Sequence, residues 1–239
     1  MISIFVSSTF SDMQAERDVL RQRVLPRLQR LASVYGESIR MVDLRWGVDT
    51  TSMSEEQATK KIMDVCFEQI DKCEGKMICL IGNRYGWVPS YDIEELATRF
   101  SLTLNSNISA TELEIQYGIF QSKNPNKATV FIRDGIKSLP EELYENFYDD
   151  NPRLEVLRSE LINSKRCLCQ HYSLEYSNGY FSGLDTFEEM AYSSLKEYIV
   201  AQCDIDTIAP HIKIKNQFDS YMENETLGYY SFPELDAEA

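Results

Sequence analysis

The first seventeen residues restrict the fold of this chain more than any other stretch. Residues 2–6 are an apolar run with the length of a buried strand. Small hydroxyl residues follow at once, and Ser11 with Gln14 then forms the sequence pattern of a helix N-terminal capping box. The chain is therefore predicted to begin with a strand, a polar loop and a helix.

The same alternation returns along the chain. Four more strand candidates lie at residues 39–43, 76–81, 128–133 and 167–172. Helical stretches separate them, with serine caps predicted at Ser54 and Ser109 and a kink at Pro26 in the first helix. Right-handed crossovers between such strands predict an α/β fold, namely a flavodoxin-like, five-stranded, mostly parallel sheet with strand one in its interior and helices on both faces.

Length and charge suggest the organisation of the chain and exclude some partners. The 239 residues suit one α/β effector domain at residues 1–205 and an acidic connector at 206–239 toward a further module. A net charge of −14 argues against nucleic acid, since tracking phosphates needs a basic surface. Without a secretory leader or an apolar run of roughly 20 residues, we expect no membrane contact and a cytoplasmic location.

The six cysteines lack the spacing of a disulfide framework, which favours reduced thiols. Three potential metal ligands lie together at Cys167, Cys169 and His171. They lack the paired spacing of structural zinc sites, and the period of two in a strand explains their pattern. The sequence therefore predicts no metal site.

Polar, cationic and aromatic residues follow three of the predicted strands. Parallel strands bring their carboxyl ends to one edge of a sheet, where ligands bind. The candidate substrate-binding residues are Ser7, Ser8, Phe10, Asp43, Arg45, Trp46, Arg84 and Tyr85. Arg45 and Arg84 are expected to bind a pyrophosphate there. Alternatively, the first loop is a solvated connection, and Arg45 and Asp43 form a structural ion pair with Trp46 in the core.

These groups suit a reaction whose leaving group is already activated. The sequence contains neither phosphate-binding glycine motif nor a G-x-S-x-G elbow with a nearby histidine. Nicotinamide bound to ribose is cationic and leaves as a neutral molecule, so it needs no general acid. One carboxylate can stabilise the oxocarbenium-like charge, as in glycoside hydrolysis. We therefore expect NAD⁺ as a substrate, with no cofactor.

Residues 3–133 resemble the N-terminal domain of NACHT and other STAND ATPases of the telomerase-associated and nephrocystin type, which is similar to Toll/interleukin-1 receptor (TIR) domains. The resemblance rests on four ordered motifs, which are IFVSSTFSDMQAER at 4–17, VDLRWG at 42–47, IGNRYGWVP at 81–89 and SATELEI at 109–115. It implies a TIR-like, flavodoxin-like effector domain. The loop at 43–47 departs from the TIR signature, which leaves its substrate contacts open.

The resemblance also implies two functions. Some TIR domains cleave NAD⁺ with a glutamate on the third helix, and Glu114, followed by Tyr117 and Gly118, matches that pattern. Such an enzyme would release nicotinamide when an attached STAND ATPase clusters it and the domains self-associate, as in cell-suicide or antiviral immunity. The alternative is a catalytically silent interaction module.

Two glutamates compete for the catalytic role, because Glu112 and Glu114 are two apart on a helix and cannot face the same way. If Ser109 caps the helix, Glu112 completes a capping box and Glu114 is free. If Thr111 caps instead, Glu114 takes the structural task. The serine caps predicted for the earlier helices, the family pattern and the space left by Gly118 favour Glu114 as the catalytic residue.

Overall fold

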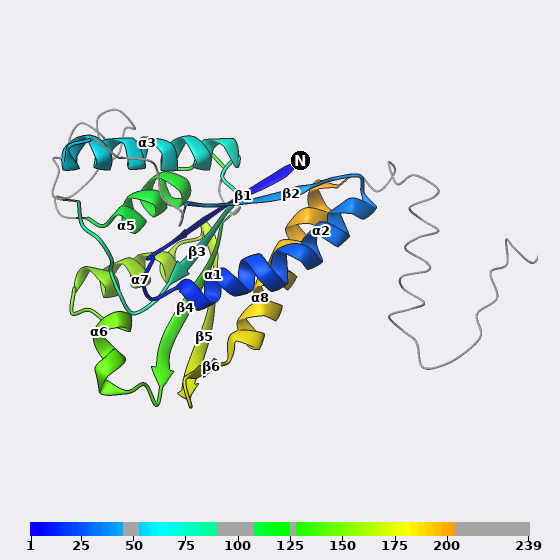
Figure 1. Cartoon of the computed structure of the whole chain (residues 1–239). Coiled ribbons are helices and arrows are strands. Elements are labelled where there is room, and N and C mark those ends of the chain that lie inside the picture. The colour runs from blue at the N-terminus through cyan, green and yellow to red at the C-terminus, as the bar shows by residue number, and fades with distance from the viewer. Residues whose placement is uncertain (45–52, 90–107, 125–127, 204–239) are drawn as a thin grey trace, which may run out of the picture.

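The computed structural model describes residues 1–44, 53–89, 108–124 and 128–203 (Figure 1). The strands are β1 (Ile2–Ser8), β2 (Ile39–Asp43), β3 (Met77–Ile81), β4 (Ala128–Lys137), β5 (Cys167–Ser177) and β6 (Tyr180–Ser182). The longer helices are α1 (Gln14–Val19), α2 (Leu25–Val34), α3 (Glu55–Lys72), α5 (Ala110–Ile115), α7 (Arg153–Asn163) and α8 (Leu184–Gln202). Short helical turns are η1 (Leu20–Val24), η3 (Gln116–Phe120), η4 (Glu141–Leu143) and α6 (Tyr144–Phe147).

One mostly parallel sheet organises these elements in the order β2-β1-β3-β4-β5-β6. The predicted interior position of β1 is confirmed, because β1 pairs in parallel with both β2 and β3. The predicted number of five strands was wrong. A sixth strand, β6, pairs antiparallel with β5 through a two-residue turn in which Asn178 and Gly179 both have positive φ. Asn-Gly between strands is a strong hairpin signal that sequence reading overlooked.

Helices cover both faces of the sheet, as predicted. Figure 1 shows α3, α5 and α7 on one side, and α1, α2 and α8 on the other. Each layer has its own apolar core, and the side chains of β3 alternate between the two. All five residues of β3 are buried, which explains its continuous apolar sequence. Among the described helices, none is long and apolar enough to cross a membrane.

The helix caps follow the sequence in two of three cases. Ser54 forms the predicted capping box with Gln57 at the start of α3, and the Ser109 hydroxyl accepts from the backbone N–H of Glu112 at 3.2 Å. The predicted cap at Ser11 was wrong, because α1 begins after Met13 without a side-chain cap. The local hydrogen bond there runs instead from the Thr9 hydroxyl to the Asp12 carboxylate.

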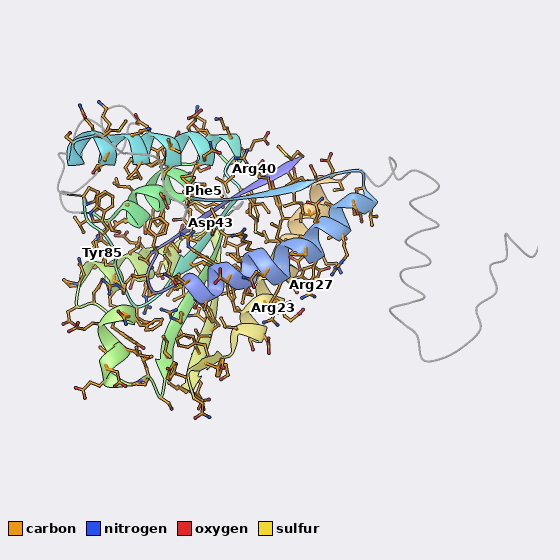
Figure 2. The ribbon with its side chains drawn as sticks, viewed as in Figure 1. Phe5, Arg23, Arg27, Arg40, Asp43 and Tyr85 are labelled. Atoms are coloured by element: carbon orange, nitrogen blue, oxygen red, sulfur yellow. The ribbon has the colours of Figure 1, made fainter. Side chains whose placement is uncertain are left out.

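The predicted kink at Pro26 takes the form of a change in helix type. The π-helical turn η1 immediately precedes α2, which has Pro26 in its first turn. Proline has no backbone N–H to continue the α-helical hydrogen bonds of the preceding turn, so an irregular turn before it is the expected outcome. Arg23 of η1 and Arg27 of α2 then pair with acidic residues of α8, including Glu188, and Figure 2 shows both arginines beside that helix.

A charged cluster lies inside the apolar layer next to α1. The guanidinium of Arg133, at the centre of β4, has no exposed surface and pairs with Asp12 at 2.9 Å and Glu16 at 2.8 Å. The hydroxyl of Tyr172 donates to Glu16 at 2.8 Å. Gly82 permits this arrangement, because a Cβ there would clash with Asp12 and Arg133. The cluster fixes the loop after β1 against the middle of the sheet.

Candidate functional site

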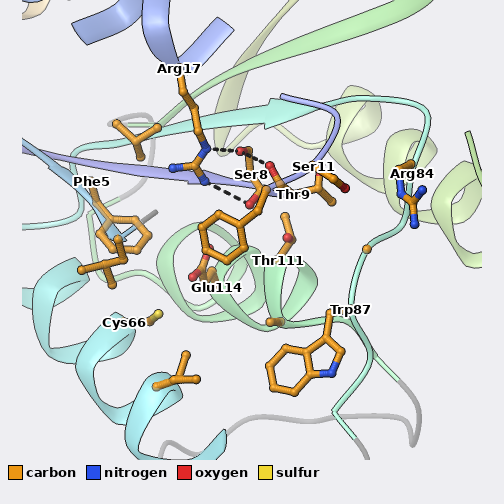
Figure 3. A pocket seen from close by; sticks show the side chains of 16 residues that line it. Phe5, Ser8, Thr9, Ser11, Arg17, Cys66, Arg84, Trp87, Thr111 and Glu114 are labelled. Atoms are coloured by element: carbon orange, nitrogen blue, oxygen red, sulfur yellow. Dashed lines mark hydrogen bonds between the residues drawn. The ribbon is translucent and has the colours of Figure 1, made fainter. Parts of the chain in front are cut away.

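A pocket of about 550 Å³ opens at the carboxyl ends of β1 and β3 (Figure 3). Its walls come from the end of β1 and the following loop, the segment after β3, and the facing sides of α3 and α5. Ser8 and Phe10 belong to the first of these walls and Trp87 to the second. Cys66 lies on α3 and Glu114 on α5. The sequence-based expectation of a hollow beside the first loop agrees with this placement.

Glu114 contributes the carboxylate that lines this pocket. Its Oε2 accepts a hydrogen bond from the hydroxyl of Ser7, and the thiol of Cys66 also bonds to the carboxylate. Burial raises the pKa of Glu114 above its ordinary value, although these two hydrogen bonds and the charge of Arg17 oppose the rise. The charged form of this carboxylate is therefore less favourable in the fold than in water.

Arg17 organises the first loop although the candidate residues did not include it. Its Nε donates to the Ser8 hydroxyl at 2.6 Å, its Nη2 to the Ser8 carbonyl at 3.1 Å, and its Nη1 pairs with Asp43. The Phe10 ring lies 5.1 Å from the guanidinium carbon, and Figure 3 shows Arg17 above Ser8. The side chain is only 2% exposed. Arg17 therefore links the end of β1 to the end of β2 through its hydrogen bonds to Ser8 and its ion pair with Asp43.

The contact bears on one of the alternatives that the sequence left open. Among the described residues, Asp43 has an arginine partner in Arg17 of α1. Arg45 and Trp46 lie outside the described residues. An arginine on the apolar face of the first helix, in line with Leu20 and Val24, was the signal for Arg17. Asp43 at the end of the next strand was the signal for its partner.

Aromatic side chains form the open rim of the pocket. Phe10 is 55% exposed and Trp87 is 47% exposed, and both line the cavity. Figure 3 shows the indole of Trp87 beside the pocket. Trp87 was also not among the candidate residues. Two exposed rings beside a largely apolar cavity suit a planar ligand that can stack on them.

Arg84 and Tyr85 differ in where they lie. Arg84 lines the pocket, and its guanidinium donates to the backbone carbonyl of Glu145. Tyr85 is 2% exposed and does not line the pocket. Its hydroxyl donates to Glu112 at 2.5 Å and accepts from the backbone N–H of Ser109 at 3.1 Å. The structure thus brings Ser8, Phe10 and Arg84 to the pocket. Tyr85 instead forms hydrogen bonds with the first turn of α5.

Glu112 has a structural role, but not the predicted one. Its carboxylate accepts from Arg153 Nε at 3.1 Å and from Tyr85, rather than from the backbone N–H of Ser109. The hydroxyl of Tyr85 accepts the hydrogen bond from the Ser109 N–H that Glu112 would have accepted in a capping box. Arg153 of α7 forms an ion pair with Glu112. Glu112 is fully buried, and it is not among the residues that line the pocket.

Glu112→Gln is therefore expected to cost more than a lost cap. Replacing the buried carboxylate removes one of the two carboxylates paired with Arg153, the other being Glu160, and should lower the free energy of unfolding by about 1–3 kcal/mol. Chemical denaturation of wild type and variant measures the difference. A loss no larger than the ~0.5 kcal/mol typical of surface substitutions would show that the Arg153 pair contributes little.

The other two members of the TIR-type pattern do not lie at the pocket. Tyr117 donates its hydroxyl to the two carboxylate oxygens of Asp71, each at 2.8 Å, and lines a separate polar hollow. Gly118 was expected to leave space for a ligand, and that was wrong. A Cβ there would lie 2.7 Å from Met77 Sδ and 3.2 Å from Ile70 Cγ2, so glycine permits close packing of η3 on the core.

Within the described residues, no group of three or more His, Cys, Asp or Glu side chains could hold a metal ion. All six cysteines are free. The chemistry that this pocket can support therefore rests on one carboxylate, hydroxyls, a buried guanidinium and aromatic faces. This set can orient and stabilise a developing positive charge, and it includes no histidine.

Comparison with known proteins shows similarity to segments of much longer chains. Telomerase protein component 1 of Rattus norvegicus is 30% identical over 206 residues, which cover 79% of this chain and 8% of the relative. A TPR repeat-containing protein of Dictyostelium discoideum is 28% identical over 249 residues (94% and 14%). NACHT domain- and WD repeat-containing protein 1 of Mus musculus is 27% identical over 175 residues (68% and 11%).

The chain thus spans about a tenth of the length of these relatives. No solved structure matches it. A family profile described as "Domain of unknown function (DUF4062)" matches residues 3–180, which include every described residue of the pocket. Since that match covers most of the 239 residues, the chain belongs to the DUF4062 family.

Proposed function

We propose that this DUF4062 domain hydrolyses the nicotinamide–ribose bond of NAD⁺. The observation that carries the proposal is the position of Glu114, whose partly buried carboxylate lines a largely apolar pocket. Two exposed aromatic rings lie at the rim of this pocket. Nicotinamide and adenine are flat rings that stack on such side chains. A ribose between two such rings would need a carboxylate, and Glu114 is the carboxylate among the described lining residues.

Cleavage of the nicotinamide–ribose bond needs few protein groups. Nicotinamide leaves as a neutral molecule, and positive charge develops on the ribose, which the ionised Glu114 stabilises. In a pocket that excludes water, this interaction is stronger than in solution. Ser7 and Cys66 both donate to the carboxylate and hold it in place, and a carboxylate has about four lone-pair sites, which leaves acceptor capacity for the ribose.

The proposed fold family is TIR-like and flavodoxin-like. The order β2-β1-β3-β4-β5 supports it, because flavodoxin-like sheets have this order and bind ligands at the carboxyl ends beside the first strand. The pocket lies at that edge. The short strand β6 extends the sheet beyond β5, on the side away from β1.

The longer relatives suggest how the activity is controlled. Two of the relatives carry NACHT and WD repeats in their names, and we propose that this domain likewise acts next to a STAND-type ATPase. Clustering by that ATPase, with self-association of the domains, would switch cleavage on in cell-suicide or antiviral immunity. Residues 206–239, the proposed connector, lie outside the described residues.

A second candidate function is a silent interaction module. It is favoured by the hydrogen bonds from Ser7 and Cys66, which already satisfy Glu114, and by the exposure of Phe10 and Trp87. In that case, the rim contacts a protein partner and the carboxylate only fixes α5 to β1.

Nicotinamide release distinguishes the two functions. The chain, free or fused to an oligomerising tag, is incubated with NAD⁺, and nicotinamide is quantified by chromatography. We expect release that increases with clustering and that Glu114→Gln abolishes. No release from any clustered form, in protein with intact secondary structure, would favour the interaction module.

Arg84→Ala tests the part of the pocket that binds phosphates. Arg84 is exposed enough to turn toward a pyrophosphate, and its visible partner is only a backbone carbonyl. Losing a charge-assisted hydrogen bond should raise the KM for NAD⁺ roughly tenfold or more with kcat little changed. Steady-state kinetics and thermal unfolding measure both effects. If the variant unfolds instead, the bond to Glu145 is structural and the binding role is wrong.

A further inference from the structure

Two thiols of β5 lie together beside a carbonyl of α7. The Sγ atoms of Cys167 and Cys169 are 3.9 Å apart. The carbonyl oxygen of Leu161 lies 3.7 Å from the first sulfur and 3.4 Å from the second. Both cysteines are free and half-buried, so small ions from solvent can reach them. Neither residue lines the pocket that contains Glu114.

These three atoms form a nearly equilateral triangle of the size that a tetrahedral metal ion needs. Zinc binds thiolate sulfur at about 2.3 Å, and two ligands at that distance and the tetrahedral angle are about 3.8 Å apart. The observed edges of 3.9, 3.7 and 3.4 Å lie around this value. An ion placed about 1 Å above the triangle is about 2.3 Å from all three atoms, which leaves the fourth position for water.

A disulfide fits this pair less well than a shared cation. Residues two apart in a strand have Cα atoms about 6.6 Å from each other, near the upper end of the range for disulfides. The sulfurs would also have to approach from 3.9 Å to about 2.0 Å. Both residues are held in register with β4, opposite Ala128 and Val130. Chelation requires no such movement.

The surroundings favour a cation over two free thiolates. Leu161 is in the last turn of α7, where the helix dipole is negative and stabilises positive charge. Its carbonyl already accepts from the backbone N–H of Ser164 at 3.1 Å, and a carbonyl oxygen has a second lone pair for a metal.

We propose that Cys167, Cys169 and the Leu161 carbonyl form a binding site for a thiophilic divalent cation of the zinc type. Two S–H bonds are replaced by two S–metal bonds, two protons pass to solvent, and no electron is transferred. The third donor is a backbone atom, so the spacing of side chains in the sequence does not reveal the site. His171 is left out of the donor set, because its Nδ1 contacts Asp134 at 2.7 Å.

Cobalt titration tests the site. The reduced chain is titrated with Co²⁺ alone, and the thiolate-to-cobalt charge-transfer band is followed in the near ultraviolet. We expect one equivalent to bind and Zn²⁺ to displace it. Cys167→Ser and Cys169→Ser should each weaken binding at least about tenfold, whereas Cys203→Ser, which alters a free thiol at the end of α8, should leave it unchanged.

A measurement on the unaltered chain covers the case in which a serine variant fails to fold. Thiol alkylation with and without Zn²⁺, read by peptide mass spectrometry, should show protection of Cys167 and Cys169 and none of Cys203. The proposal is overturned if no charge-transfer band forms, if the band survives in the Cys167→Ser/Cys169→Ser chain, or if Zn²⁺ leaves the alkylation of both cysteines unchanged.

Discussion

Glu114→Gln is expected to abolish NAD⁺ cleavage and, at the same time, to raise the thermal stability of the domain at neutral pH. The amide cannot carry the negative charge that stabilises the developing oxocarbenium ion, so kcat should fall at least about a hundredfold. The glutamine side chain keeps an oxygen that can accept the hydrogen bond from the Ser7 hydroxyl. The variant should therefore fold with the pocket intact.

The gain in stability follows from the raised pKa of Glu114. In the unfolded chain this group ionises near its model value of 4.5, whereas in the folded chain burial holds its pKa higher. Below pH 4.5 the group is neutral in both states and its burial carries no charge penalty. As the pH rises through the folded pKa, the folded state has to accommodate a buried charge, and stability is lost. Glutamine avoids that loss.

Thermal unfolding between pH 4 and pH 8 measures the effect. The melting temperature of Glu114→Gln should exceed that of the wild type at neutral pH, and the difference should shrink toward pH 4. Glu112→Gln, an identical change two residues away, is the matched control and should lower stability, because it removes the buried carboxylate paired with Arg153 and leaves that arginine only the more distant Glu160 at 3.4 Å. Full cleavage activity in Glu114→Gln, or a melting temperature below that of the wild type at neutral pH, would contradict the assignment.

The same argument sets the pH dependence of the proposed reaction. Cleavage requires the ionised carboxylate, so its rate should rise with pH through the raised pKa of Glu114. The acid limb should therefore lie above the 4.5 of an ordinary glutamate.

Arg133→Met should cause the largest loss of stability, about 3–5 kcal/mol. Methionine fills much of the same space, but Asp12 and Glu16 then remain buried without their cation. A buried pair adds little net stability when complete, yet removing one partner leaves the other charge uncompensated. Urea denaturation gives the difference in unfolding free energy between wild type and variant.

Two comparison variants separate charge from packing. Arg23→Met breaks ion pairs with Asp185 and Glu188 at a side chain that is 46% exposed, and should cost less than about 1 kcal/mol. Adding Asp12→Asn and Glu16→Gln to Arg133→Met should restore part of the lost stability by removing the unpaired charges. Equal effects of Arg133→Met and Arg23→Met would show that the buried cluster is not held by charge.

The sequence by itself determined the elements whose signals are local. The apolar run of β3 and the serine caps of α3 and α5 follow from residues a few positions apart. The Asn178–Gly179 turn that creates β6 was equally local and was overlooked. The interior position of β1 followed from the order of strands and helices along the whole chain. Because a helix cap or a strand pattern is completed within one or two turns of chain, no distant partner is needed to recognise it.

Only the tertiary structure decided how the charged groups pair. Arg17 meets Asp43 across 26 residues, Arg153 meets Glu112 across 41, and Arg133 meets Asp12 across 121. In the sequence, Arg133 looks like the polar end of an apolar strand, and the pattern that places Arg17 on the apolar face of a helix does not name its partner. Burial makes both arginines depend on nearby carboxylates, because a charge away from water is stable only beside its opposite. Which opposite is within reach depends on how β1, α1 and β4 pack together.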